Sequence, residues 1–201
     1  KLVHEWLGNE KVDYGKKEKK DQVGTVTGLA YTSFGGDILQ IEATRFTGKG
    51  RLVLTGQLGD VMKESASIAL DYVRTHANEF KIDPKLFEEN DVHIHVPEGA
   101  VPKDGPSAGV TMTTALVSCF SNIPVKANLA MTGEVTLRGN VLPIGGLKEK
   151  SLAAHRSGID TILIPKENVK DLDDVPQEVK DAVTFIPCSN VSQVLHNALV
   201  K

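Results

Sequence analysis

Cysteine, aromatic residues and long apolar runs are all scarce in this chain. Its 201 residues include two cysteines and one tryptophan, and aromatic residues make up 5% of it. Cys119 and Cys188 lie far apart and match no zinc-binding spacing, so we expect reduced, buried thiols in a cytoplasmic protein and no zinc site. The apolar runs fall far short of the ~20 residues of a membrane span, and no signal peptide is visible. We therefore expect no membrane segment.

Neither sign of charge dominates the sequence. The chain has 23 lysines and arginines against 26 aspartates and glutamates, which gives a net charge of −3. The two signs are interspersed, so the chain has no basic patch of the kind that binds nucleic acid. A hydrophobic fraction of 40% and a charged fraction of 24% are ordinary for a soluble globular protein, and the length suffices for one domain with a real core.

The first 22 residues differ from the rest of the chain. Residues 1–14 carry scattered apolar side chains without a clean period, and GKKEKKDQ at 15–22 is typical of a charged, solvated connector. The chain starts with Lys1 rather than methionine, so we expect a fragment whose partner domain lies before residue 1. We predict a lead-in over residues 1–22 and one folded domain over residues 23–201.

Hydrophobic periodicity predicts a β-rich first half followed by alternating strands and helices, which is an α/β (α+β) fold. A hairpin turn is expected at residues 34–37, where Gly35 and Gly36 separate two alternating segments. The predicted strands are 24–32, 37–46, 51–56, 91–97, several short strands within 128–146, then 159–165 and 183–187. The predicted helices are 58–80, 107–121, 147–158 (closed by a left-handed Gly158), 174–179 and 191–200.

Ser107 stands out because a tight turn, PKDGPSAG at 102–109, delivers it to the start of an apolar helix. It could be a helix N-cap, part of a phosphate cradle, or a nucleophile. Asp104 is a better cap than Ser107; if Asp104 or the turn caps the helix, Ser107 lies in the first turn beside free N–H groups that suit an oxyanion. The pentapeptide GPSAG fits G-x-S-x-G, but a match this short carries little alone.

The phosphate-cradle interpretation requires a motif that this chain does not have. The sequence GxxxxGK[ST] is missing, and the nearest approach, Gly48-Lys49-Gly50, lacks the hydroxyl. We therefore expect no Walker-type ATP site in this chain.

A serine nucleophile needs a base, and histidine is the first candidate. His93 and His95 are two residues apart on one strand face. We favour a half-buried or solvent-facing pair there, since a zinc site would lack a third ligand at recognisable spacing.

Lysine is the other candidate base. On a helical wheel Lys150 falls between Ala153 and Ala154, whereas Lys148 lies in a different sector. Burial there would lower the amine pKa from ~10.4 and make it a general base; the alternative is an ordinary surface lysine. Thr132 ends a predicted strand, where its hydroxyl could orient a lysine amine, although β-propensity alone also explains a threonine there.

Three motifs occur in order along the chain: PKDGPSAG, MTGE at 131–134 and GGLKEK at 145–150. With them the sequence closely resembles the proteolytic domain of bacterial Lon proteases, over residues 23–200. The serine motif is similar to that of the soluble, cytoplasmic subfamily rather than that of membrane-anchored relatives.

The resemblance implies a role for each matching residue. The family's catalytic serine falls on Ser107, its catalytic lysine on Lys150, and the threonine that contacts the lysine on Thr132. Asp104 and Gly105 would support the nucleophile. The segment 96–105 matches the region where extended substrate lies, so the expected substrate-binding residues are Pro97, Glu98, Gly99, Ala100 and Val101.

The resemblance also implies an activity: an ATP-dependent serine endopeptidase that forms an acyl-enzyme and degrades unfolded, damaged or regulatory proteins. It implies a Lon-type α/β fold related to one domain of a ribosomal protein and to small-molecule kinases. It implies no metal or cofactor in this domain, ATP and Mg²⁺ in an upstream ATPase module, and a hexameric ring in the cytoplasm. Two alternatives stay open: a phosphotransferase of the small-molecule kinase type, and a non-catalytic module that only builds a ring.

Overall fold

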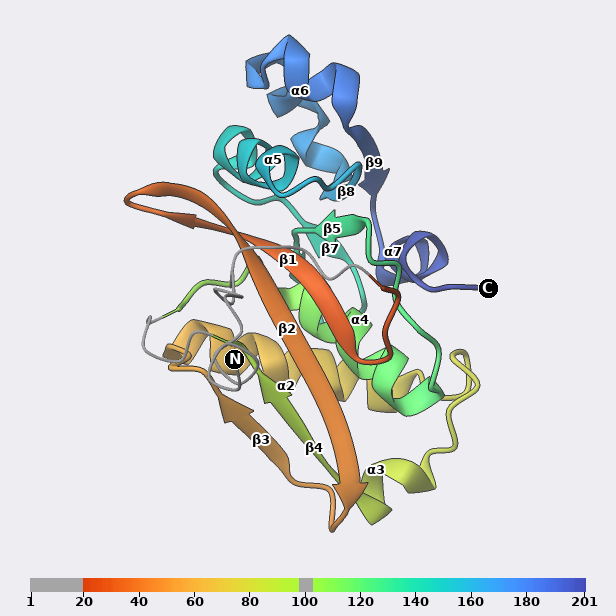
Figure 1. The fold of residues 1–201 in the computed structure, drawn as a ribbon. Helices are drawn as coiled ribbons and strands as arrows, with labels where there is room; N and C mark the ends of the chain where they lie inside the picture. The colour runs from red at the N-terminus through yellow and green to blue at the C-terminus, as the bar shows by residue number, and fades with distance from the viewer. Residues whose placement is uncertain (1–19, 98–102) are drawn as a thin grey trace, which may run out of the picture.

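The structure, a computed structural model, describes residues 20–97 and 103–201. It is built on a mixed sheet of seven strands in the order β3-β4-β2-β1-β5-β8-β9, beside a small sheet of β6 and β7 (Figure 1). The strands are β1 (Thr25–Thr32), β2 (Gly35–Thr47), β3 (Leu52–Thr55), β4 (Asn90–His95), β5 (Leu129–Met131), β6 (Glu134–Val135), β7 (Val141–Leu142), β8 (Thr161–Pro165) and β9 (Thr184–Cys188). The helices are α2 (Asp60–Thr75), α3 (Lys85–Glu89), α4 (Gly109–Ser121), α5 (Leu147–Arg156), the 3₁₀ helix η1 (Lys166–Asp174), α6 (Gln177–Ala182) and α7 (Val191–Ala198).

The sheet contains both antiparallel and parallel strand pairs, and its edge strand β3 pairs parallel with β4. β1 and β2 form an antiparallel hairpin, and β4 pairs antiparallel with β2. The later strands β5, β8 and β9 run parallel to β1 and to one another, with α5, η1 and α6 in their connections. The α/β prediction is therefore confirmed, although the hairpin turn lies at residues 33–34 rather than 34–37, because Gly35 and Gly36 already pair with β1.

The sheet separates two hydrophobic clusters, one on each face. Successive strand residues point to opposite faces, and in β5 Leu129 and Met131 belong to the larger cluster whereas Ala130 belongs to the smaller one. Helices α2 and α4 pack on the face of the sheet that carries the larger cluster. Helices α5 and α6 pack on the face that carries the smaller cluster. Helix residues that take part are Met62, Ala66, Val73, Val110 and Leu116 in the larger cluster, and Leu147, Ala154 and Val179 in the smaller one.

The helix predicted over 58–80 is shorter in the structure, where α2 ends at Thr75. The apolar spacing continues, since Ala77 is still buried, but the backbone turns at His76. The turn closes where the N–H of Ile82 donates to the carbonyl of Ala77. Apolar spacing alone therefore overestimated the helix by about two turns in total, because α2 also begins later, at Asp60.

The helix predicted over 107–121 begins at Gly109. The N–H of Gly109 donates to Pro106, and the carbonyl of Ser107 accepts from Gly133 instead of from the helix. Ser107 thus lies in a turn before α4, not in its first turn. The short helices α3 and η1 were not predicted, and α6 begins three residues later than expected; Gly158 has the predicted left-handed backbone, with φ of +77°.

Gly36 lets β2 pack directly on the backbone of α5. A Cβ placed there would overlap the carbonyl oxygen of Glu149 and lie 2.9 Å from the backbone nitrogen of Lys150. Both obstacles are main-chain atoms in the first turn of α5, so no side-chain rotation relieves the overlap. This contact sets how closely α5 approaches the sheet.

We expect Gly36→Ala to lower the free energy of unfolding by about 1–3 kcal/mol, as overpacking does in other proteins. Gly145→Ala is the control, because a Cβ there meets no atom within 4 Å. Urea unfolding followed by circular dichroism measures both. Equal stability of the two variants would contradict the close packing of β2 on α5.

Candidate active site

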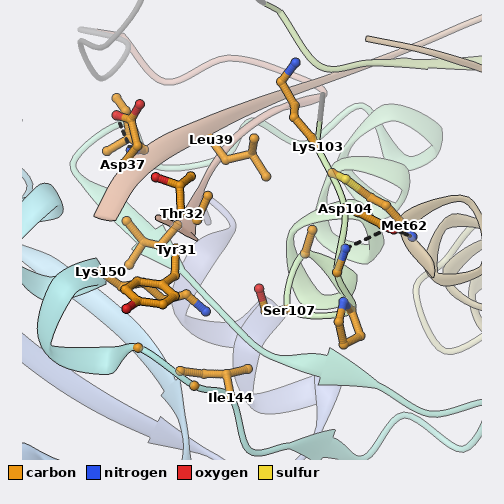
Figure 2. Close-up of a pocket in the computed structure, with 18 of the residues that line it drawn as sticks. Tyr31, Thr32, Asp37, Leu39, Met62, Lys103, Asp104, Ser107, Ile144 and Lys150 are labelled. Carbon is orange, nitrogen blue, oxygen red and sulfur yellow. Dashed lines mark hydrogen bonds between the residues drawn. The ribbon is translucent and has the colours of Figure 1, made fainter. Parts of the chain in front are cut away.

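A cavity of about 540 Å³ opens between three segments of the described chain. Its walls come from the β1–β2 hairpin (29–32 and 37–40), the turn 103–108 before α4, and the loop 143–146 with Lys150 of α5. Figure 2 shows the side chains of Ser107 and Lys150 entering it from opposite sides. Most of the rest of the lining is apolar, including Leu29, Met62 and Ile144.

Lys150 is buried, with 2% of its surface exposed. Its Nζ donates a hydrogen bond to Thr132 Oγ1 at 3.2 Å. Within residues 20–97 and 103–201 this amine forms no ion pair with a carboxylate. Desolvation without a counter-charge disfavours the ammonium form, and it lowers the pKa of Lys150 from 10.5 to about 8. Roughly a tenth of the amines are then neutral at pH 7, and about half at pH 8.

The helical register of α5 explains why this lysine is buried. Leu147, Ala153 and Ala154 are buried on the same helix, and Lys148 is exposed. The two alanines leave room for a long side chain to lie along the helix. Of the two possibilities that the sequence left open for Lys150, a buried base or a surface lysine, the structure has the buried one, and Lys148 is the surface lysine.

Two adjacent residues after β5 join the lysine to the serine segment. Thr132, 1% exposed, accepts the hydrogen bond from Lys150, and the N–H of the next residue, Gly133, donates to the carbonyl of Ser107 at 2.9 Å. Gly133 in turn accepts from the N–H of Val110 in α4 at 3.0 Å. The sequence indicated Thr132 but not Gly133, whose contribution is made entirely by its backbone.

The turn that carries Ser107 is bound to the loop before α2. Lys103 exchanges backbone hydrogen bonds with Gln57 and Gly59, at 3.0 and 2.7 Å. Asp104 Oδ1 accepts from the N–H of Met62, in the first turn of α2, and from the N–H of Gly105, both at 2.9 Å.

We expected Asp104 or the turn to cap the helix that follows Ser107, and for Asp104 the expectation is wrong. Asp104 caps α2, which starts with a glycine at its N-cap and has no side chain of its own there. The N-cap of α4 is Ala108, and no side chain makes a cap hydrogen bond at that helix end. Ser107 is therefore not an N-cap, and its hydroxyl faces the cavity.

Ser107 and Lys150 share the cavity without a hydrogen bond between them in the described residues. The amine is held by Thr132 instead. Catalytic hydrogen bonds are often long in the absence of substrate and tighten when it binds. The arrangement thus holds the two groups ready on facing walls.

The expected substrate-binding segment is only partly described. Pro97 lines the cavity. Glu98, Gly99, Ala100 and Val101 lie outside the described residues.

The remaining candidates have ordinary structural roles. His93 and His95 are half-buried on β4 and share the hydroxyl of Thr55, at 2.8 and 2.6 Å. Within the described residues no three His, Cys, Asp or Glu side chains are placed to hold a metal ion. Cys119 and Cys188 are free and buried, and burial raises the pKa of each thiol to about 11. No helix in the same part of the chain is long and apolar enough to cross a membrane.

A serine hydroxyl and a desolvated lysine amine in one cavity are the groups that a serine hydrolase with a lysine base requires. The family profile described as "Lon protease (S16) C-terminal proteolytic domain" matches residues 1–201. The chain therefore belongs to the Lon protease family, as a serine peptidase domain. This assignment favours the protease over the phosphotransferase and the non-catalytic module.

Curated relatives agree with the family assignment. The chain is 59% identical over 201 residues to the Lon protease of Brevibacillus choshinensis, covering 100% of this chain and 26% of the relative. It is 60% identical over 200 residues to that of Bacillus thuringiensis (strain Al Hakam), covering 100% and 25%. It is 56% identical over 200 residues to Lon protease 1 of Bacillus subtilis (strain 168), covering 100% and 26%. The chain thus spans about a quarter of the length of these relatives.

The buried amine predicts a pH-dependent cost to the fold. Because the pKa of Lys150 is about 8 when folded and near 10.5 when unfolded, the unfolded chain binds more protons between these values, and stability rises with pH across that window. Below pH 8 the folded amine is mostly charged, so the full free-energy cost of burying that charge lowers the stability of the fold. Lys150→Met should therefore stabilise the domain at pH 7 by about 2 kcal/mol, after loss of the hydrogen bond to Thr132.

Urea unfolding of both proteins at pH 7 and pH 9.5 checks this expectation. The advantage of Lys150→Met should shrink at the higher pH, because the folded amine is then neutral and its burial no longer desolvates a charge, while the unfolded lysine is still largely protonated. A constant difference at both pH values would mean that the amine is not desolvated.

Proposed function

We propose that this domain cleaves peptide bonds with Ser107 as the nucleophile and Lys150 as the general base. The observation that carries the proposal is the desolvated amine of Lys150 in the cavity that Ser107 faces. Neutral Lys150 takes the proton of Ser107 Oγ as this oxygen attacks the peptide carbonyl carbon. The protonated amine then gives that proton to the leaving nitrogen, the C–N bond breaks, and an acyl-enzyme ester remains.

Water completes the reaction by the same route. Lys150 accepts a proton from a water molecule whose oxygen attacks the ester, and returns it to Ser107 Oγ as the carboxylic product leaves. Thr132 keeps the amine directed into the cavity throughout, because its hydroxyl accepts one of the amine hydrogens.

The backbone N–H groups of Ser107 and Ala108 are our candidates for the oxyanion hole. The N–H groups of residues 105–107 are the candidates that the sequence places around the nucleophile. Within the described chain Gly105 donates to Asp104, and Pro106 has no N–H. Ser107 and Ala108 follow directly, and their N–H groups make no hydrogen bond within residues 20–97 and 103–201. Loss of one oxyanion donor costs on the order of 10²–10³ in rate in other serine hydrolases.

An extended, unfolded polypeptide is the substrate that the cavity favours. Such a chain offers free main-chain groups that can pair with a strand edge, and its apolar side chains can occupy the apolar walls. Pro97 at the cavity supports a substrate path along residues 97–101.

The relatives are about four times as long as this chain, which supports a proposal about further domains of the whole protein. We propose that residues 1–22 lead in from an upstream ATPase module that binds ATP and Mg²⁺, and that residues 23–201 are the protease domain. The whole protein would form a hexameric ring in the cytoplasm and degrade unfolded, damaged or regulatory proteins. Its protease fold would be related to one domain of a ribosomal protein and to small-molecule kinases.

Casein cleavage by this domain joined to its ATPase module tests the dyad. Ser107→Ala and Lys150→Met should each lower kcat/KM by at least about 10³-fold, since each removes a group that acts on the reacting atoms. The kcat/KM of the unmodified protein should rise with pH and level off above about 8, as Lys150 loses its proton. ATPase activity and thermal unfolding serve as controls, and cleavage that survives in either variant would rule out the dyad.

Thr132 can be tested separately from the dyad. Thr132→Val keeps the shape of the side chain but removes the hydrogen-bond acceptor of Lys150, so kcat should fall about tenfold to a hundredfold. Thr132→Ser retains the hydroxyl and should keep most of the activity. Steady-state cleavage of a short fluorogenic peptide measures both, and equal activity of the two variants would show that the hydroxyl does not orient the amine.

A further inference from the structure

Asn168 is a buried amide on η1, with 1% of its surface exposed. It uses its donors and its acceptor on two neighbours. Its Oδ1 accepts from the N–H of Ile144 at 2.9 Å, and its Nδ2 donates to the carbonyl of the same residue at 2.9 Å. Nδ2 also donates to Asp171 Oδ2 at 2.7 Å.

The paired contacts replace a neighbouring strand. Ile144 lies between the end of β7 at Leu142 and the start of α5 at Leu147, so no ladder holds its backbone. The amide of Asn168 presents one donor and one acceptor side by side, as a strand would. Asp171 fixes the orientation of the amide, because its carboxylate can accept only from the nitrogen.

The segment held in this way is a wall of the cavity. Residues 143–146 all line it, and in Figure 2 Ile144 lies below Ser107 and Lys150. Gly145 and Gly146 follow, and the left-handed Gly146, with φ of +71°, accepts the N–H of Lys150. Two successive glycines have wide conformational freedom, so an anchor on Ile144 determines where this wall lies.

The amine of Lys150 has further supports besides that wall. Lys150 is held by Thr132 and by the packing of Leu147 and Ala154 in the smaller cluster. Loss of the Asn168 contacts therefore frees the wall more than the amine.

We propose that Asn168, oriented by Asp171, is a positioning residue that sets the cavity wall at residues 143–146 and thereby the affinity for the substrate polypeptide. This inference rests on the proposed peptidase function of Ser107 and Lys150. Asn168 touches no reacting atom and acts through Ile144.

Peptide cleavage by the whole ATPase–protease chain provides the test. Asn168→Leu keeps the branched shape of the side chain but removes all three hydrogen bonds, and Asp171→Ala keeps the amide but removes its support. We expect KM to rise roughly tenfold in Asn168→Leu and less in Asp171→Ala, with kcat and its pH profile changed less than threefold. Asn197→Ala is the matched control, because that amide donates to the Gln193 carbonyl on α7, away from the cavity.

Hydrogen exchange gives a readout that does not depend on activity. Mass spectrometry of the peptide that covers residues 143–146 should show faster exchange in Asn168→Leu, because the N–H of Ile144 loses its acceptor. Unchanged KM with a lower active fraction, or unchanged exchange, would overturn the inference and leave the peptidase proposal intact. If Asn168→Leu fails to fold, Asp171→Ala decides by the same criteria. Cleavage that survives in Ser107→Ala would instead overturn the proposed function.

Discussion

The desolvation of one amine is the constraint on which the rest of the site depends. A lysine side chain resists burial, because its charged form loses water and gains only a hydroxyl partner here. The fold accommodates it by placing Lys150 on an alanine-rich helix face and by bringing β2 against the α5 backbone at Gly36. The same burial that lowers the stability of the fold lowers the pKa into the range where the amine works as a base. The cost to folding and the chemistry therefore have one cause.

The carboxyl end of β5 is the junction between the two reacting groups. Thr132 binds the lysine through its side chain, and Gly133 binds the serine segment through its backbone. A Cβ on Gly133 would lie 2.8 Å from Val141 Cγ1 and 3.0 Å from Val110 Cγ1, so a larger residue there would force these two valines to move. Within the short sequence MTGE, Thr132 thus supplies a hydroxyl, and its neighbour Gly133 allows close packing.

The sequence indicated which side chains belong to the site better than it indicated which groups those side chains contact. The alanine spacing on one helix made a buried Lys150 possible without deciding it, and the motif resemblance indicated Ser107, Lys150 and Thr132. Asp104 was assigned to the wrong helix, because the helix it caps starts more than forty residues earlier and no local pattern connects the two. The sequence contains no signal for Asn168 for a similar reason. A single asparagine in an acidic stretch belongs to no periodic pattern, and its contact with Ile144 is visible only in the folded structure.

The two reacting groups belong to different halves of the hydrophobic interior. The serine turn continues into α4, whose Val110 and Leu116 pack in the larger cluster, while α5 carries the lysine above the smaller cluster through Leu147 and Ala154. The sheet lies between these clusters, and the hydrogen bonds of residues 132 and 133 connect the groups across it. Packed interiors deform little, so the separation of Ser107 and Lys150 is set by how each helix layer rests on the sheet. For this reason residues outside the cavity, such as Gly36 and Asn168, belong to the explanation of the site as much as the dyad does.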